Sequence, residues 1–122
     1  MQISWREYKN KKYIYVDYRG CMKEQASLDL LYQEVEMLKQ LPENEKTLAL
    51  ANYEGAFATV GFMKEVKRIG KEVLVNKIKK TALLGVDGFK TVFVQGYTLF
   101  TGDTSLKCFK NENDALEWLI AD

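Results

Sequence analysis

The chain has 122 residues, of which 47% are hydrophobic, with 18 basic and 17 acidic side chains and no histidine. This length suits one domain with a sizeable core and is too short for two ordinary domains. A net charge of +1 argues against a nucleic-acid-binding domain, which would be strongly basic. We therefore expect a single domain over residues 1–122 and no nucleic-acid partner.

The composition also bears on location and cofactors. The N-terminus lacks the layout of a signal peptide, and no apolar run approaches the roughly 20 residues of a membrane span, so we expect a cytoplasmic protein. Two cysteines without histidine form neither a disulfide framework nor a zinc pattern. No nucleotide-binding glycine motif is present. The sequence predicts no cofactor and no metal.

The first half of the chain reads as a hairpin, a helix and a strand. Residues 2–9 and 12–20 form two strand patterns around a polar turn, which indicates an antiparallel hairpin with the first strand at an edge. Residues 23–41 predict an acidic amphipathic helix, with Leu28, Leu31, Val35 and Leu38 inside and Glu34 among the outer acidic positions. Pro42 stops this helix, and residues 46–53 predict a buried strand.

The second half alternates helix and strand. Helices are expected over 62–73 and 111–122, the latter with Asn111 as N-cap, and strands over 82–86 and 105–110. Residues 89–100 favour a helix because the apolar positions keep a helical period, although their β-branched and aromatic content leaves a hairpin open. The order ββαβαβαβα predicts an α/β fold with a mixed, mostly parallel sheet of about five strands and about four helices.

The phrases YIYVDYRG, LALANYEG, KKTALLGVDGFKTVF and LKCFKNENDALEWL resemble the STAS-like, sporulation anti-anti-sigma-like domains of bacteria. The resemblance covers nearly the whole chain and implies the architecture more than the activity, because the same fold grades into the lipid-binding CRAL-TRIO type. In regulatory members of the family, a serine in an Asp-Ser-Ser-Gly turn is phosphorylated by a partner kinase. The matching stretch here, residues 58–61, keeps a hydroxyl at Thr59 and the glycine at Gly61 but lacks the aspartate and the second serine.

Three loops follow the second, third and fourth predicted strands and should meet at one edge of the sheet, where ligands collect in such folds. Each loop carries a glycine, which either brings backbone close to a ligand or simply turns the chain. A set of aromatic residues on the neighbouring helices would line a cavity or form ordinary core. The candidate binding residues are Gly20, Tyr53, Gly55, Phe57, Thr59, Phe62, Asp87 and Gly88.

Thr59 has two interpretations. Its hydroxyl either caps the following helix, which is the common role of such a residue, or accepts a phosphate at the helix N-terminus. The sequence offers little for catalysis, because no histidine is present and no spacing brings Asp17, Glu54 and Asp87 together. Cys21 precedes a helix but would still need a nearby base. Cys21 and Cys108 fit buried thiols, Cys108 the more so because it lies within a strand pattern. We expect no enzymatic activity.

Three functional hypotheses remain from the sequence. The first is a non-enzymatic regulatory module that contacts a protein partner through residues 52–61 and the helix that follows. The second is a carrier or sensor that holds a small apolar or amphipathic ligand between the helices. The third, an enzyme around Asp17, Cys21 and Asp87, has the least support, and the aromatic edge hairpin also leaves a homodimer open.

Overall fold

The computed structural model describes residues 2–56, 58–88 and 90–122. Within them, five strands form one sheet in the same order in space as in sequence. The first two strands pair antiparallel, and every later pair is parallel. The strands are β1 (Ile3–Tyr8), β2 (Lys11–Asp17), β3 (Thr47–Asn52), β4 (Ile78–Leu84) and β5 (Leu106–Phe109).

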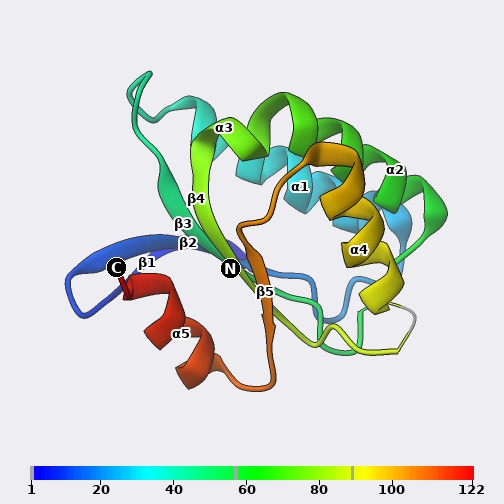
Figure 1. Ribbon diagram of the computed structural model, residues 1–122. Coiled ribbons are helices and arrows are strands. Elements are labelled where there is room, and N and C mark those ends of the chain that lie inside the picture. The colour runs from blue at the N-terminus through cyan, green and yellow to red at the C-terminus, as the bar shows by residue number, and fades with distance from the viewer. Residues whose placement is uncertain (1, 57, 89) are drawn as a thin grey trace.

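Helices cover both faces of this sheet, as Figure 1 shows, with α5 on one face and the other helices on the opposite face. A π-helix, η1, continues α2 without a break and runs into the short α3, so these three segments form one continuous helical stretch. The helices are α1 (Glu24–Lys39), α2 (Val60–Ile69), η1 (Gly70–Leu74), α3 (Val75–Lys77), α4 (Lys90–Thr101) and α5 (Glu112–Ile120). In the described residues, no helix is both long and apolar enough to cross a membrane.

The alternation of side chains along the strands builds two apolar layers. On β2, Ile14 and Val16 point into the larger layer beneath α1, α2 and α4, whereas Tyr13 and Tyr15 point toward α5. This period of two is what a strand buried on both faces requires. The larger layer is the one that contains the candidate site.

The fold predicted from sequence is confirmed, including the hairpin, the parallel strands and the α/β order. The hairpin alternative for residues 89–100 is wrong, because Lys90–Thr101 is the helix α4. The strand predicted at 82–86 begins earlier, at Ile78, and ends at Leu84. It includes Lys80, whose ammonium donates hydrogen bonds to the carbonyls of Trp118 and Ala121 at the end of α5 at 2.9 and 2.7 Å. The strand accommodates the charged Lys80 because its ammonium group caps the C-terminus of α5.

The expectation that Cys108 is buried is also wrong. Cys108 is exposed on β5, which is one of the two edge strands of the sheet and has no fully buried side chain, whereas Cys21 is buried. On α4, Tyr97 is buried, but Val92 and Phe100 are 65% and 51% exposed. The Phe100 ring lies 5.0 Å from the ammonium of Lys71 in η1. The helical period of α4 is therefore real, but only part of its apolar set faces the interior.

Candidate functional site

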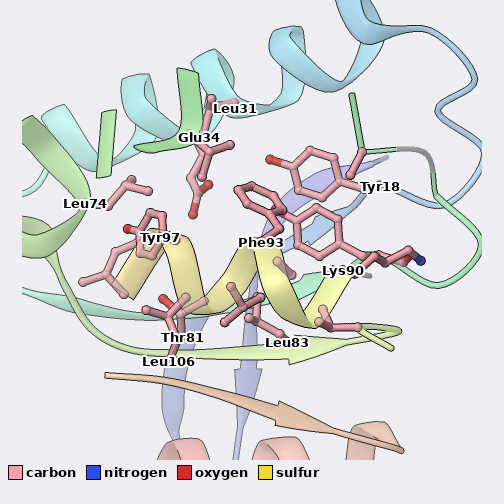
Figure 2. A pocket seen from close by; sticks show the side chains of 17 residues that line it. Tyr18, Leu31, Glu34, Leu74, Thr81, Leu83, Lys90, Phe93, Tyr97 and Leu106 are labelled. Atoms are coloured by element: carbon pink, nitrogen blue, oxygen red, sulfur yellow. The ribbon is translucent and has the colours of Figure 1, made fainter. Parts of the chain in front are cut away.

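A cavity of about 70 Å³ lies between the sheet and the helical layer formed by α1, α2, η1 and α4 (Figure 2). Its wall is mostly apolar, and its few polar groups come from different elements. The lining residues are Tyr18, Leu31, Glu34, Ala51, Tyr53, Ala58, Val66, Leu74, Ile78, Thr81, Leu83, Val86, Lys90, Phe93, Val94, Tyr97 and Leu106. A mostly apolar hollow with a few convergent polar groups is the usual form of a small-molecule site.

Glu34 is the most unusual of these groups. Its side chain points from α1 into the cavity toward Phe93 and Tyr97 (Figure 2), and the residue is only 7% exposed. No hydrogen bond or ion pair joins its carboxylate to another described residue, and the carboxylate oxygens keep some accessible surface. Burial of the residue raises its pKa to about 7. Buried carboxylates are ordinarily paired or hydrogen-bonded, because desolvation disfavours the charged form. An unpaired one in a cavity marks a candidate functional site.

The sequence places Glu34 on the outer, acidic side of its helix, and this expectation is wrong. Ser27, Leu31, Glu34 and Leu38 are all buried and share one stripe of α1, at spacings of four, three and four. The signal was available, since Glu34 lies three residues after one buried leucine and four before another. The sequence-based interpretation placed Glu34 outside because it is a charged residue, although its position on the helix matches the buried stripe.

Three tyrosines from different elements surround the space in front of Glu34. The rings of Tyr18, after β2, and Tyr53, after β3, are stacked at 4.5 Å, and Phe62 of α2 packs edge-on against both. Burial raises the pKa of Tyr18, Tyr53 and Tyr97, and the nearby charge of Glu34 raises all three further. These hydroxyls therefore stay neutral near pH 7 and are potential hydrogen-bond partners for a ligand.

Lys90 lies at the other end of the cavity. Its side chain points away from Glu34, and its ammonium donates hydrogen bonds to the carbonyl oxygens of Tyr53 and Gly85 at 3.0 and 3.1 Å. These two bonds join the start of α4 to the loops after β3 and β4. The only ammonium group among the described lining residues is thus already bonded to backbone and is directed away from the carboxylate.

The burial of the lining residues indicates where the cavity approaches the surface. Tyr18, Leu31, Glu34, Leu83 and Tyr97 are buried. The partly buried lining residues lie mostly near the start of α4 and on β5, namely Tyr53, Ala58, Thr81, Val86, Lys90, Phe93, Val94 and Leu106. A ligand entering from the side of α4 and β5 would therefore meet Glu34 at its innermost end.

Of the predicted binding residues that the structure describes, only Tyr53 lines the cavity. Phe62 is 1% exposed and supports the tyrosine stack, and Phe57 lies outside the described residues. Gly20, Gly55 and Gly88 have φ angles of 81°, 68° and 56°, and a Cβ at any of them would meet no atom within 4 Å. Positive φ angles in turns favour glycine, so turn geometry alone explains why these three positions are glycine. Asp87 accepts at its backbone carbonyl from the amide of Lys90 and belongs to the turn before α4.

Thr59 is the N-cap of α2, as one of its two interpretations predicts. Its hydroxyl oxygen accepts from the amide of Phe62 at 3.1 Å and also donates to the carboxylate of Glu24. A Cβ at Gly61 would lie 2.8 Å from the carboxyl carbon of Glu24, so this glycine makes room for that carboxylate. The hydroxyl therefore already has a donor and an acceptor, and phosphorylation at Thr59 stays a hypothesis.

The residues weighed for catalysis serve other contacts. The Asp17 carboxylate binds the guanidinium of Arg19 through two bonds of 2.9 Å, and the hydrogen bond from that side chain is the largest cause of its lowered pKa. Cys21 is buried and accepts from the Gln2 amide at 3.6 Å. In the described part of the chain, no three acidic, cysteine or histidine side chains gather as metal ligands would.

Comparison with known proteins identifies the fold. No family model matches the sequence, and no curated protein matches it. The structure is a SpoIIAA-like, that is STAS-like, α/β domain, which confirms the resemblance at the level of architecture. A similar solved structure is that of an uncharacterized protein from the DUF3478 family with a SpoIIAA-like fold, from Shewanella loihica PV-4. The TM-score is 0.68 at 14% sequence identity, and the match covers 96% of this chain and 91% of that chain.

Proposed function

We propose that the protein binds a small amphipathic molecule in the cavity beneath α1 and α4 and does not transform it. The observation that carries this proposal is the carboxylate of the buried residue Glu34, which has no partner among the described residues and is directed into a mostly apolar hollow. An arrangement that leaves a charge unpaired lowers stability, so a ligand that occupies the site is a physical reason for its presence.

The size of the cavity limits the buried part of the ligand. A cavity of about 150 Å³ accepts benzene, and one water occupies about 30 Å³ of liquid. The 70 Å³ hollow therefore accommodates a chain of a few heavy atoms, and a longer molecule would extend toward the half-buried side chains of α4 and β5. The STAS-like fold agrees with a binding role but does not specify one.

A protein-interaction role has less support at the surface proposed for it. Phe62 is buried in the aromatic stack and is not available to a partner. Arg68, on the outer face of α2, is occupied by Glu65 at 2.6 Å and Glu72 at 3.0 Å. The regulatory hypothesis therefore rests on the fold and on one exposed apolar side chain, Val60 at the start of α2, whereas the binding hypothesis rests on a specific cavity.

Xenon uptake tests whether the cavity accepts a guest, because xenon enters apolar cavities without needing a polar partner. Under xenon pressure, amide NMR shifts are expected at Ala51, Leu74 and Leu83 in the wild type. Ala51→Leu and Leu74→Phe, which fill the cavity from the sheet and from η1, should remove these shifts. Leu48→Phe enlarges a partly buried side chain on the opposite face of the sheet and should leave them unchanged. Xenon shifts absent from the wild type would overturn the proposal.

The natural ligand can be sought by native mass spectrometry of protein purified gently from the cells that make it. A mass excess that disappears on denaturation, and that is missing from Ala51→Leu, would identify a noncovalently bound molecule. The same excess in both variants would place the molecule elsewhere on the protein and would contradict the proposed site.

A further inference from the structure

We infer that the ligand carries an organic ammonium group, which Glu34 receives as a counter-ion at the inner end of the cavity. This inference rests on the proposed function and adds the chemistry of the ligand. It follows from three features of the site: the unpaired carboxylate, the position of Lys90, and the aromatic rings around the hollow.

No basic residue in the described part of the chain pairs with Glu34. Lys90 is the only basic residue among the described lining residues, and its ammonium is bonded to the carbonyl oxygens of Tyr53 and Gly85, pointing away from the carboxylate. A second molecule must therefore bring the positive charge if Glu34 is to be paired. In a site of low polarity such a pair interacts far more strongly than in water, provided that both charges are hydrogen-bonded.

The aromatic lining favours an ammonium over a neutral donor. Tyr18, Tyr53, Phe93 and Tyr97 all line the cavity that contains the carboxylate. The faces of aromatic rings attract cations, and rings around one hollow are a recurrent means of binding organic ammonium groups. Tyr18 and Tyr53 cover one face of each other, so Phe93 and Tyr97, toward which Glu34 points, are the rings best placed for this contact. An alkyl alcohol would form a hydrogen bond with Glu34 but gain nothing from these faces, and an alkyl carboxylate would be repelled.

Ammonium binding should depend on pH, because only ionised Glu34 forms the ion pair. The titratable groups near Glu34 among the described residues are the hydroxyls of Tyr18, Tyr53 and Tyr97, and the Asp103 carboxylate lies beside Tyr97. Burial raises the pKa of all three tyrosines, so their hydroxyls stay neutral over this range. Lys90 and an alkylammonium both stay charged near neutrality. Affinity should therefore rise from pH 6 to pH 8 as Glu34, with a pKa of about 7, loses its proton.

The test compares three probes of equal chain length by amide NMR titration at pH 8: n-propylammonium, n-propanol and propionate. Hydrogen bonds to charged groups imply that propylammonium binds about tenfold to a hundredfold more tightly than propanol. Glu34→Gln keeps the shape but removes the charge, and should lose this preference while still admitting xenon. Glu36→Gln, on the exposed face of the same helix, should keep it.

The outcomes separate this inference from the proposed function. If xenon enters but propylammonium binds no more tightly than propanol, the ammonium inference is overturned and the binding proposal stands. If neither xenon nor any propyl probe enters, both are overturned. Should Glu34→Gln fail to fold, carboxyl-carbon NMR of wild-type Glu34 decides the matter, because a bound propylammonium must lower the titration midpoint. An unchanged midpoint at saturating probe would overturn the inference.

Discussion

The ring of Tyr97 occupies the space in which a side chain at position 70 would lie. A Cβ on Gly70 would be 2.5 Å from Cε1 and 2.7 Å from Cζ of this ring. Gly70 is the first residue of the π-helix η1, and Tyr97 is the buried aromatic of α4 that lines the cavity. Because Gly70 in η1 has no side chain, the Tyr97 ring of α4 can pack against it and form part of the cavity wall.

Gly70→Ala should therefore displace Tyr97 and destabilise the protein, even though alanine is the better helix former. Forcing one extra carbon into a packed interior costs about 1–3 kcal/mol. Urea unfolding measures this difference. Gly96→Ala in α4 is the matched control, because its Cβ would meet only the flexible end of Lys67, with the nearest atom at 3.3 Å. Equal stability of the two variants would contradict the close packing of Tyr97 on Gly70.

Glu34 should make stability depend on pH in a direction opposite to that of most carboxylates. Its pKa is raised from 4.5 to about 7 by burial, so the folded state binds this proton more tightly than the unfolded state. The resulting stability is full below about pH 4.5, falls between pH 4.5 and 7, and is absent above pH 7. A shift of this size corresponds to about 3 kcal/mol, as an order of magnitude.

The measurement is the free energy of unfolding of wild type minus that of Glu34→Gln between pH 4 and pH 8. Subtraction removes the contributions of other carboxylates, such as Asp17, whose lowered pKa acts in the opposite direction. We expect the wild type to lose stability relative to Glu34→Gln as the pH rises. A difference that is independent of pH would show that Glu34 titrates alike in the folded and unfolded states.

Thr59 should contribute to stability as the cap of α2. Thr59→Ala removes the bond to the Phe62 amide and the contact with Glu24, and is expected to cost about 1 kcal/mol in thermal or urea unfolding. Thr59→Ser keeps the hydroxyl and should lie close to the wild type. A serine variant as unstable as the alanine variant would mean that the methyl group, not the cap, matters.

Phosphorylation of Thr59 is disfavoured by its neighbour. The Glu24 carboxylate accepts from the hydroxyl and would repel a phosphate at the same position. After incubation with nucleotide in a cell lysate, the intact mass is expected to show no phosphate at Thr59. A phosphate located there by peptide mapping would contradict the capping interpretation as the whole role of this residue and would favour the regulatory hypothesis.

The two cysteines should differ in reactivity. Cys108 is exposed and Cys21 is buried, so a thiol reagent should modify one group rapidly in the folded protein and the second only on unfolding. Cys108→Ser should abolish the fast reaction. A fast reaction that persists in Cys108→Ser would place Cys21 at the surface and contradict the packing after β2.

The order of the elements could be predicted from sequence because it depends on periodicity and on turn residues, both of which are local. The start of β4 could not, since Lys80 enters the strand only because the end of α5 offers carbonyls to its ammonium. The sequence also could not predict which apolar side chains of α4 are exposed. Val92 and Phe100 fit a helical stripe, but which part of that stripe meets the interior depends on where the helix lies on its neighbours.

The candidate site was predicted less well than the fold. Sequence reasoning looked to the loops at the strand ends and, in the carrier hypothesis, to a cavity between the helices. The cavity does lie beneath the helices, but of the predicted binding residues that the structure describes only Tyr53 lines it. Glu34 was missed because a glutamate on an amphipathic helix is usually solvated. Lys90 was missed because its two partners are backbone carbonyls of separate loops, a contact that no local pattern encodes.

The central claim is that the Glu34 carboxylate lies unpaired in a cavity, and a pH titration of its carboxyl carbon by NMR in the free, folded protein tests it most directly. We predict a midpoint near 7, since burial is the cause of the shift. A midpoint near 4.5, the ordinary value, would mean that this carboxylate is solvated or paired, and would contradict both the proposed binding site and its preference for an ammonium group.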